Sequence, residues 1–129
     1  MALPKILVVD DDEESRQLLS EVLEANGYVV GAVADGQQAR EALGQDSEYG
    51  IVIADLHMPK ETGLELLRHL REQNSNHSIV LMSSFISVSE RQVAQDLGAQ
   101  ALLEKPFRLS ELLDVVGGLA QKRPMIATS

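Results

Sequence analysis

Short apolar runs alternate with longer amphipathic segments along most of the chain. The runs contain mainly β-branched and aliphatic residues and read "KILVV", "YVVGAV", "IVIA", "IVLMS" and "ALLE". Continuous apolar runs of this length are typical of strands that are buried on both faces, as in parallel sheets. The pattern therefore predicts five strands, at residues 5–9, 28–33, 51–54, 79–83 and 101–104.

The segments between these runs carry apolar residues at helical spacing. The first places Leu18, Leu19, Val22 and Leu23 on one face before the stop signal Asn26-Gly27. The same periodicity predicts helices over residues 13–25, 37–43, 62–73, 89–97 and 110–119. Regular alternation of strands and helices predicts an α/β domain, in which right-handed crossovers place helices on both faces of a parallel sheet.

Polar residues follow the predicted strands. Asp10 and Asp11 come after the first strand, Asp55 after the third, Ser84 after the fourth and Lys105 after the fifth. Ligands of such sheets bind beyond the carboxyl ends of the strands, so we expect these side chains to share one edge.

The chemistry of this set favours phosphoryl transfer to a carboxylate. Three clustered carboxylates repel one another unless a cation lies among them, and Mg²⁺ (or Mn²⁺) prefers carboxylate oxygens. We therefore predict a metal site at Asp10, Asp11 and Asp55. An aspartate can also act as a nucleophile and form an acyl phosphate. Ser84 and Lys105 would then contact the phosphoryl oxygens.

Each of these residues also has a simpler interpretation when it is taken alone. An aspartate after a strand is more often a turn or cap residue, Ser84 a loop hydroxyl and Lys105 a solvated charge. The acidic run at residues 12–14 is explained by the dipole of the following helix. Only the joint placement of the residues after four strands favours a functional site.

Composition excludes several other classes of function. The 129 residues suit one domain, and 11 basic against 20 acidic residues give a net charge of −9. This charge and the 3% aromatic content argue against nucleic-acid binding by this segment. There is no long apolar run for a membrane span and no cysteine for a disulfide. A cytoplasmic location is the simplest interpretation, with a domain at residues 1–121 and a polar tail or linker at 122–129.

The sequence resembles the receiver domains of two-component response regulators over residues 5–119. The matching segments occur in the family's order and spacing: "ILVVDDD", "IVIADLHMP", "GLELLRHLR", "IVLMSS", "GAQALLEKPF" and "LLDVV". The resemblance implies a flavodoxin-like doubly wound fold, with strand order 2-1-3-4-5 and five helices in a three-layer α/β/α arrangement.

The resemblance also implies a role for each candidate residue. Asp55 matches the phosphorylated aspartate, and Asp10 and Asp11 the acidic pair that holds Mg²⁺, with the backbone carbonyl of His57 as a further ligand. Ser84 matches the switch hydroxyl, and Lys105 the lysine that contacts the phosphoryl group and precedes a cis proline.

The implied function is a signalling switch and not a turnover enzyme. The phosphoryl donor would be a sensor histidine kinase or a phosphotransfer protein. A downstream effector domain or protein would read the surface of the fourth helix, fifth strand and fifth helix. A phosphorylation-dependent homodimer is also compatible with this function.

Three positions depart from the family's pattern. Leu102 fills the position of the usual aromatic rotameric switch, and Phe85 replaces a residue that is commonly small. Ile86 occupies a position that tunes hydrolysis in the family, yet it cannot orient a water molecule. The ring of His57 is not needed for the metal, so we expect it to be exposed to solvent.

Three alternative functions compete with this one. A phosphatase of the haloacid-dehalogenase type needs a second aspartate two residues after the nucleophile, where this chain has His57. A flavodoxin-like cofactor binder needs a phosphate-cradling loop, and "DDDEES" would repel phosphate. A pseudo-receiver that is never phosphorylated stays open because of Phe85 and Leu102.

Overall fold

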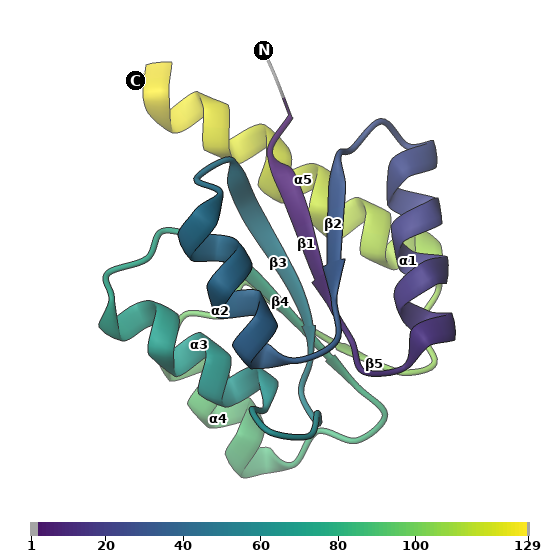
Figure 1. The fold of residues 1–129 in the computed structure, drawn as a ribbon, viewed down its shortest axis with the longest axis vertical. Coiled ribbons are helices and arrows are strands. Elements are labelled where there is room, and N and C mark those ends of the chain that lie inside the picture. Colours follow the sequence, from purple (N-terminus) through teal and green to yellow (C-terminus); the bar gives the residue numbers. More distant parts are fainter. Residues whose placement is uncertain (1–2, 129) are drawn as a thin grey trace.

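A single parallel sheet with strand order β2-β1-β3-β4-β5 organises the molecule (Figure 1). The computed structural model describes residues 3–128, and side chains as far as Gln121. The elements follow one another as β1 (Lys5–Val9), α1 (Glu13–Ala25), β2 (Val30–Val33), α2 (Gly36–Gln45), β3 (Tyr49–Asp55), α3 (Gly63–Glu72), β4 (Ser78–Ser83), α4 (Val88–Asp96), β5 (Ala101–Glu104) and α5 (Leu109–Thr128). The predicted flavodoxin-like α/β fold and its strand order are confirmed.

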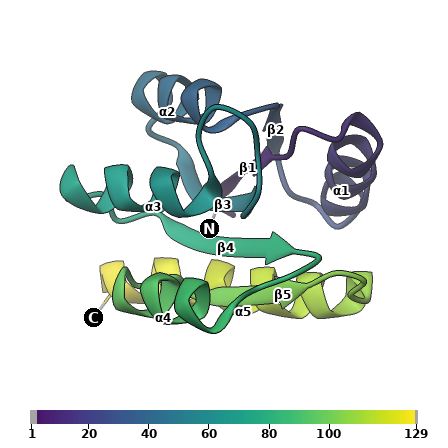
Figure 2. The same cartoon turned by 90° about the horizontal axis from the view of Figure 1, so that it is seen from below.

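Two apolar cores fill the space between the sheet and its helices. In the central strands, side chains alternate between the two faces, as pleated strands require. Leu7 and Val9 of β1 pack with α2, α3 and α4, whereas Ile6 and Val8 pack with α1 and α5. Every residue of β3 and β4 is buried. Figure 2 shows α1 on the opposite side of the sheet from α2 and α3.

Side-chain caps fix where four of the helices begin. Asp12, Asp35, Thr62 and Ser87 each accept a hydrogen bond from the backbone N–H three residues further on. These groups satisfy N–H donors that a helix start leaves free. Because each cap follows a loop at the carboxyl end of a strand, the four helix starts lie near the same edge of the sheet.

Element boundaries differ from the prediction by a few residues. The helix predicted from residue 37 begins at Gly36, and β3 extends beyond the apolar run to Tyr49 and Asp55. The backbone of α5 continues into the predicted tail. The side chains of residues 122–128, and all of Ser129, lie outside the described residues, so the domain boundary at residue 121 stays a prediction. Within the described part of the chain, no helix has the length and apolar character needed to span a membrane.

Candidate functional site

The sheet register brings Asp10, Asp55 and Lys105 to one point. Strands β1 and β3 pair at Val9 and Ala54, so Asp10 and Asp55 leave the sheet side by side. Lys105 follows β5, and its Nζ lies 2.9 Å from Oδ2 of Asp55 and 3.7 Å from Oδ2 of Asp10. Both carboxylates are buried, which is rare for aspartate unless a partner compensates its charge.

Asp10 is the most deeply buried of the three predicted metal ligands Asp10, Asp11 and Asp55, and one of its carboxylate oxygens has no hydrogen bond. Its Oδ1 accepts a hydrogen bond of 2.9 Å from the backbone N–H of Asp12. Its Oδ2 is buried and has no hydrogen-bond partner among the described residues, since Lys105 is at ion-pair distance only. Burial raises the pKa of Asp10, while the Asp12 N–H and the Lys105 charge act in the opposite direction.

The carboxylates of Asp10, Asp11 and Asp55 fit a hard divalent cation. One oxygen of each lies within 4.8 Å of the others, and Asp11 is exposed while the other two are buried. The unsatisfied Oδ2 of Asp10 is a free ligand atom inside this cluster. The side chain of Asp12 is occupied elsewhere because it caps α1. Glu13 and Glu14 lie in the first turn of α1, as expected for an acidic run that interacts with the helix dipole.

Lys105 is the cation that holds this cluster together. Its backbone N–H donates to the carbonyl of Ser83 at 2.7 Å, which fixes the start of the β5–α5 loop against β4. Burial alone would lower the pKa of Lys105, but its hydrogen bond to Asp55 and the nearby carboxylates outweigh burial and raise it. The predicted cis peptide between Lys105 and Pro106 is present.

The hydroxyl nearest the end of β4 belongs to Ser83, a residue that sequence reasoning passed over in favour of Ser84. Strand β4 ends at Ser83, which is buried, and Ser84 is exposed on the following loop. The Oγ of Ser83 donates to the carbonyl of Phe85 at 2.8 Å and accepts from its N–H at 3.2 Å. The sequence signal for this hydroxyl was available, because Ser83 ends the apolar run.

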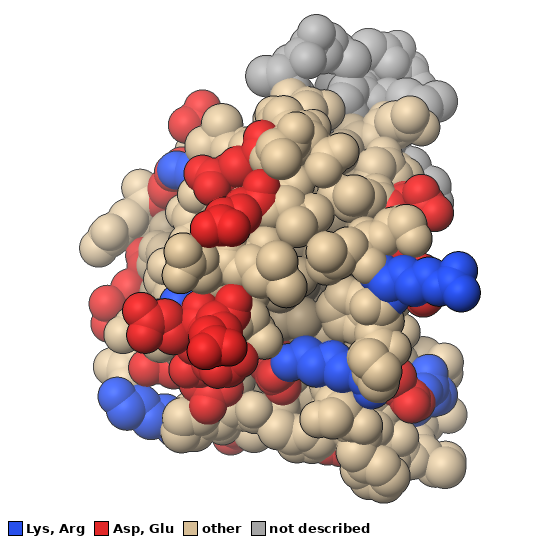
Figure 3. Space-filling view, turned by 90° about the vertical axis from the view of Figure 1, so that its right-hand side faces the viewer, with Lys and Arg blue, Asp and Glu red and all other residues tan. Residues whose placement is uncertain are grey.

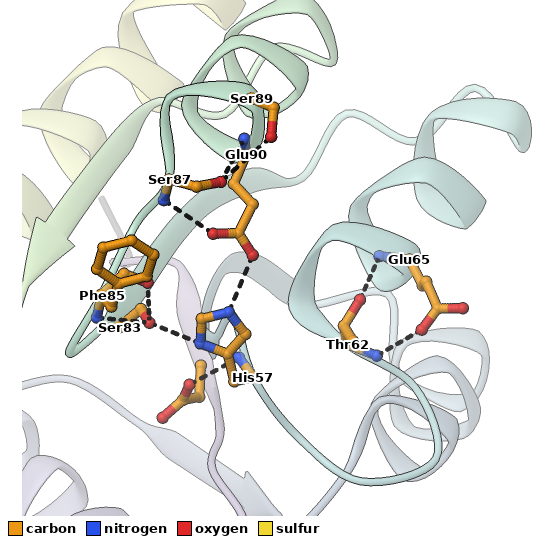
Figure 4. A network of polar contacts seen from close by, with 9 residues as sticks. His57, Thr62, Glu65, Ser83, Phe85, Ser87, Ser89 and Glu90 are labelled. Carbon is orange, nitrogen blue, oxygen red and sulfur yellow. Dashed lines mark hydrogen bonds and ion pairs between the residues drawn. The ribbon is translucent and has the colours of Figure 1, made fainter.

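The side chain of His57 is exposed, as expected, and its ring also makes two polar contacts. Its Nδ1 lies 2.9 Å from Oγ of Ser83, and its Nε2 lies 2.9 Å from Oε2 of Glu90 on α4 (Figure 4). The backbone N–H of His57 donates to Oδ1 of Asp55 at 2.9 Å. Hydrogen bonds from the Ser87 backbone and from the His57 ring lower the pKa of Glu90.

The three positions that depart from the family's pattern, Phe85, Ile86 and Leu102, differ in burial. Phe85 is 68% exposed on the loop after β4. Leu102 is half-buried in β5 and packs against the core formed with α2, α3 and α4. The adjacent position Ile86 is buried.

An apolar hollow opens beside Lys105. It has a volume of about 340 Å³ and lies between α1 and the β5–α5 loop; its lining includes Leu18, Leu19, Phe107 and Leu109. Leu18 is half-exposed at its rim.

Figure 3 shows the face of the molecule that carries α1, where acidic side chains gather in patches with few basic ones.

Comparison with known proteins places this geometry in a family. The family model for the response regulator receiver domain matches residues 6–117. The chain belongs to the response regulator receiver domain family. It is 41% identical over 109 residues to the response regulator MprA of Mycolicibacterium vanbaalenii, covering 84% of this chain and 47% of that protein. It is 39% identical over 118 residues to MprA of Mycobacterium leprae, covering 92% and 51% of the two chains. The receiver domain thus spans about half the length of these curated relatives.

Solved receiver structures have the same fold. The chemotaxis protein CheY4 of Vibrio cholerae is 31% identical with a TM-score of 0.84, and the match covers 92% of this chain and 99% of that one. A response regulator receiver protein from Pseudomonas putida is 33% identical with a TM-score of 0.87, covering 92% and 98%. The resemblance inferred from the sequence motifs is therefore confirmed.

Proposed function

We propose that this receiver domain is a phosphorylation-dependent signalling switch with Asp55 as the phosphoacceptor. The observation that carries the proposal is the position of Asp55 at the end of β3, in contact with Lys105 and within a cluster of carboxylates that suits Mg²⁺. The donor would be a phosphohistidine on a sensor histidine kinase or phosphotransfer protein. Family membership supports this role, since response regulators act with such kinases.

In the proposed reaction, a carboxylate oxygen of Asp55 attacks the phosphorus atom of the phosphohistidine. The new O–P bond forms as the N–P bond breaks, and the imidazole of the donor leaves with the bonding electrons. Lys105 compensates negative charge on the phosphoryl oxygens, because its ammonium already lies at Asp55. Asp10, Asp11, Asp55 and the backbone carbonyl of His57 would hold Mg²⁺ (or Mn²⁺), which supplies further charge neutralisation.

One hydroxyl near the end of β4 would donate to a phosphoryl oxygen, and two serines compete for this role. The sequence motif favours Ser84, whereas the buried position of Ser83 beside the ring of His57 favours Ser83. We give the role to Ser83. The Ser83→Ala variant should then take up phosphate about tenfold more slowly, the loss expected for a hydrogen bond to a charged group, and Ser84→Ala should react normally. The reverse order of rates would return the role to Ser84.

The proposal also covers the consequences of phosphorylation. The phosphoryl group adds charge and acceptor oxygens, which would bias the surface formed by α4, β5 and α5 towards an effector domain, an effector protein or a second copy of this domain. The domain would assist its own phosphorylation and dephosphorylation without being a turnover enzyme. We place it in the cytoplasm, where sensor kinases expose their catalytic domains.

Intact-mass measurement after incubation with acetyl phosphate tests the function directly. We expect the gain of one phosphoryl group, which requires both Mg²⁺ and Asp55 and is therefore absent in Asp55→Asn. If the protein stays unmodified while a known receiver reacts under the same conditions, the proposal is wrong. The pseudo-receiver alternative, an interaction module that is never phosphorylated, would then be favoured. Phe85 would be the first residue to replace with a smaller one.

A further inference from the structure

The ring of His57 connects three segments that are far apart in the sequence. His57 lies in the loop between β3 and α3, Ser83 ends β4, and Glu90 belongs to the first turn of α4. The two ring nitrogens contact one residue each, at 2.9 Å in both cases. Figure 4 shows the ring between the Ser83 hydroxyl and the Glu90 carboxylate.

Glu90 already has a structural task without His57. It completes the capping box of α4, in which the Ser87 side chain accepts from the Glu90 N–H and the Glu90 side chain accepts from the Ser87 N–H. Helix α3 begins with the same box, formed by Thr62 and Glu65. One carboxylate oxygen is enough for this task, and the second oxygen of Glu90 contacts His57.

The Ser83 hydroxyl faces its own loop in this structure. Its single proton goes to the carbonyl of Phe85 or to Nδ1 of His57, depending on the tautomer of the ring, and its oxygen accepts from the N–H of Phe85. A hydroxyl with these partners has no proton left for a phosphoryl oxygen, because it carries only one. It must therefore leave these two acceptors, the Phe85 carbonyl and the His57 ring, before it can donate to phosphorylated Asp55.

We infer that His57 and Glu90 form a latch that holds the Ser83 hydroxyl in this loop-facing orientation and couples its release to the first turn of α4. The inference rests on the proposed function, in which Ser83 contacts the phosphoryl group. His57 and Glu90 are positioning residues, since they act through Ser83. The backbone carbonyl that His57 would offer to a metal does not depend on its side chain.

The latch predicts a specific pattern of phosphorylation rates. Initial rates of mass gain with acetyl phosphate and Mg²⁺ are compared for wild type, His57→Ala, Glu90→Gln and the double variant. Removing the ring should speed phosphorylation about fivefold, the worth of one net hydrogen bond. Glu90→Gln keeps the capping box but loses the charge at His57, so a smaller increase is expected. The double variant should match His57→Ala alone, because both changes break the same connection.

Glu65→Gln is the matched control, because it makes the same chemical change in the capping box of α3. Its rate should equal that of wild type. The latch is refuted if His57→Ala is no faster, if the effects of the two changes multiply in the double variant, or if Glu65→Gln accelerates the reaction as Glu90→Gln does.

Hydrogen exchange separates failure of the latch from failure of the proposed function. If wild type takes no phosphoryl group, the proposed function fails, and amide exchange in the unmodified protein still tests the connection. The amide of Glu90, which donates to Ser87, should exchange several-fold faster in His57→Ala and be unchanged in Glu65→Gln. Equal exchange in wild type and His57→Ala would overturn the latch by itself.

Discussion

Neutralising Asp10 should stabilise the metal-free protein. The Asp10 carboxylate is fully buried, one of its oxygens has no hydrogen bond, and its pKa is raised by burial. In Asp10→Asn the amide keeps an oxygen that can accept from the Asp12 N–H, while the buried charge disappears. We therefore expect a higher free energy of unfolding at neutral pH without Mg²⁺.

The magnitude follows from the charges around Asp10. Repulsion from Asp55, with oxygens within 4.8 Å, costs about 3 to 4 kcal/mol at an effective dielectric constant of about 20. Attraction to Lys105 at 3.7 Å stabilises the Asp10 charge by about 4 kcal/mol at the same dielectric constant. The exposed Asp11 adds about 1 kcal/mol of repulsion, because its surroundings are close to water. These terms nearly cancel, so the cost of burying the charge decides the sign. We expect a gain of about 1 to 2 kcal/mol.

The dependence on pH has a definite sign. Because the pKa of Asp10 is higher in the folded state, the folded protein binds more protons than the unfolded chain between the ordinary carboxyl pKa and the raised value. Wild type therefore loses stability as the pH rises through this window, and Asp10→Asn does not. The two proteins should converge when the pH falls below the ordinary carboxyl pKa.

Urea unfolding followed by far-ultraviolet circular dichroism, with a chelator present, measures the difference. Asp12→Asn is the control, because asparagine also caps helices and Asp12 is exposed. Adding Mg²⁺ should stabilise wild type by mass action and stabilise Asp10→Asn much less. A destabilised Asp10→Asn at neutral pH, or one that responds to Mg²⁺ as wild type does, would refute the reasoning.

Three further predictions concern packing and partner contacts. Arg71 donates hydrogen bonds to four backbone carbonyls, and these bonds connect the end of α3 with the start of β4 and the end of α4. Arg71→Ala should therefore lower the free energy of unfolding in urea by about 3 kcal/mol, and Arg71→Lys should recover little of this loss. A Cβ at Gly63 would lie 2.6 Å from the carbonyl oxygen of Asp55, so Gly63→Ala should lower the free energy of unfolding by about 2 kcal/mol. Gly44 lies in α2 with open space around it, so Gly44→Ala should raise the free energy of unfolding by about 0.5 to 1 kcal/mol. We expect the donor protein to cover the apolar hollow, because the hollow is lined in part by Lys105, which contacts Asp55. Leu18→Glu at its rim should then slow transfer from a phosphohistidine donor and leave modification by acetyl phosphate unchanged.

The fold could be predicted because its signals are local. Each buried strand is a short apolar run, and each helix has its own periodicity of apolar residues. Topology rules then bring the strand ends together, so the sequence predicts that Asp10, Asp55 and Lys105 meet, as they do in the structure.

The details that the sequence left open depend on side-chain direction and long-range contact. Two adjacent serines, Ser83 and Ser84, are chemically the same, and only the point where β4 ends decides which of them is buried. The partners of the His57 ring are 26 and 33 residues away, so no local pattern links them. The second task of Glu90 is hidden because its capping-box motif already explains the residue.

The acidic residues after β1 destabilise the fold locally but provide the ligands that the proposed function needs. A buried carboxylate with an unsatisfied oxygen is a poor choice for a stable fold, and Lys105 compensates for only part of the surrounding negative charge. Conflicts of this kind are expected at functional sites, where a bound ligand supplies the charge or hydrogen-bond partner that the protein itself lacks. If Mg²⁺ and a phosphoryl group supply the missing partners, the Lys105 ammonium no longer has to neutralise Asp55 alone, and the Ser83 hydroxyl gains an acceptor that competes with the carbonyl of Phe85. The charge imbalance at Asp10 and the orientation of Ser83 would then be two parts of one switch, with the His57 ring as the connection that carries the change from the sheet edge to α4.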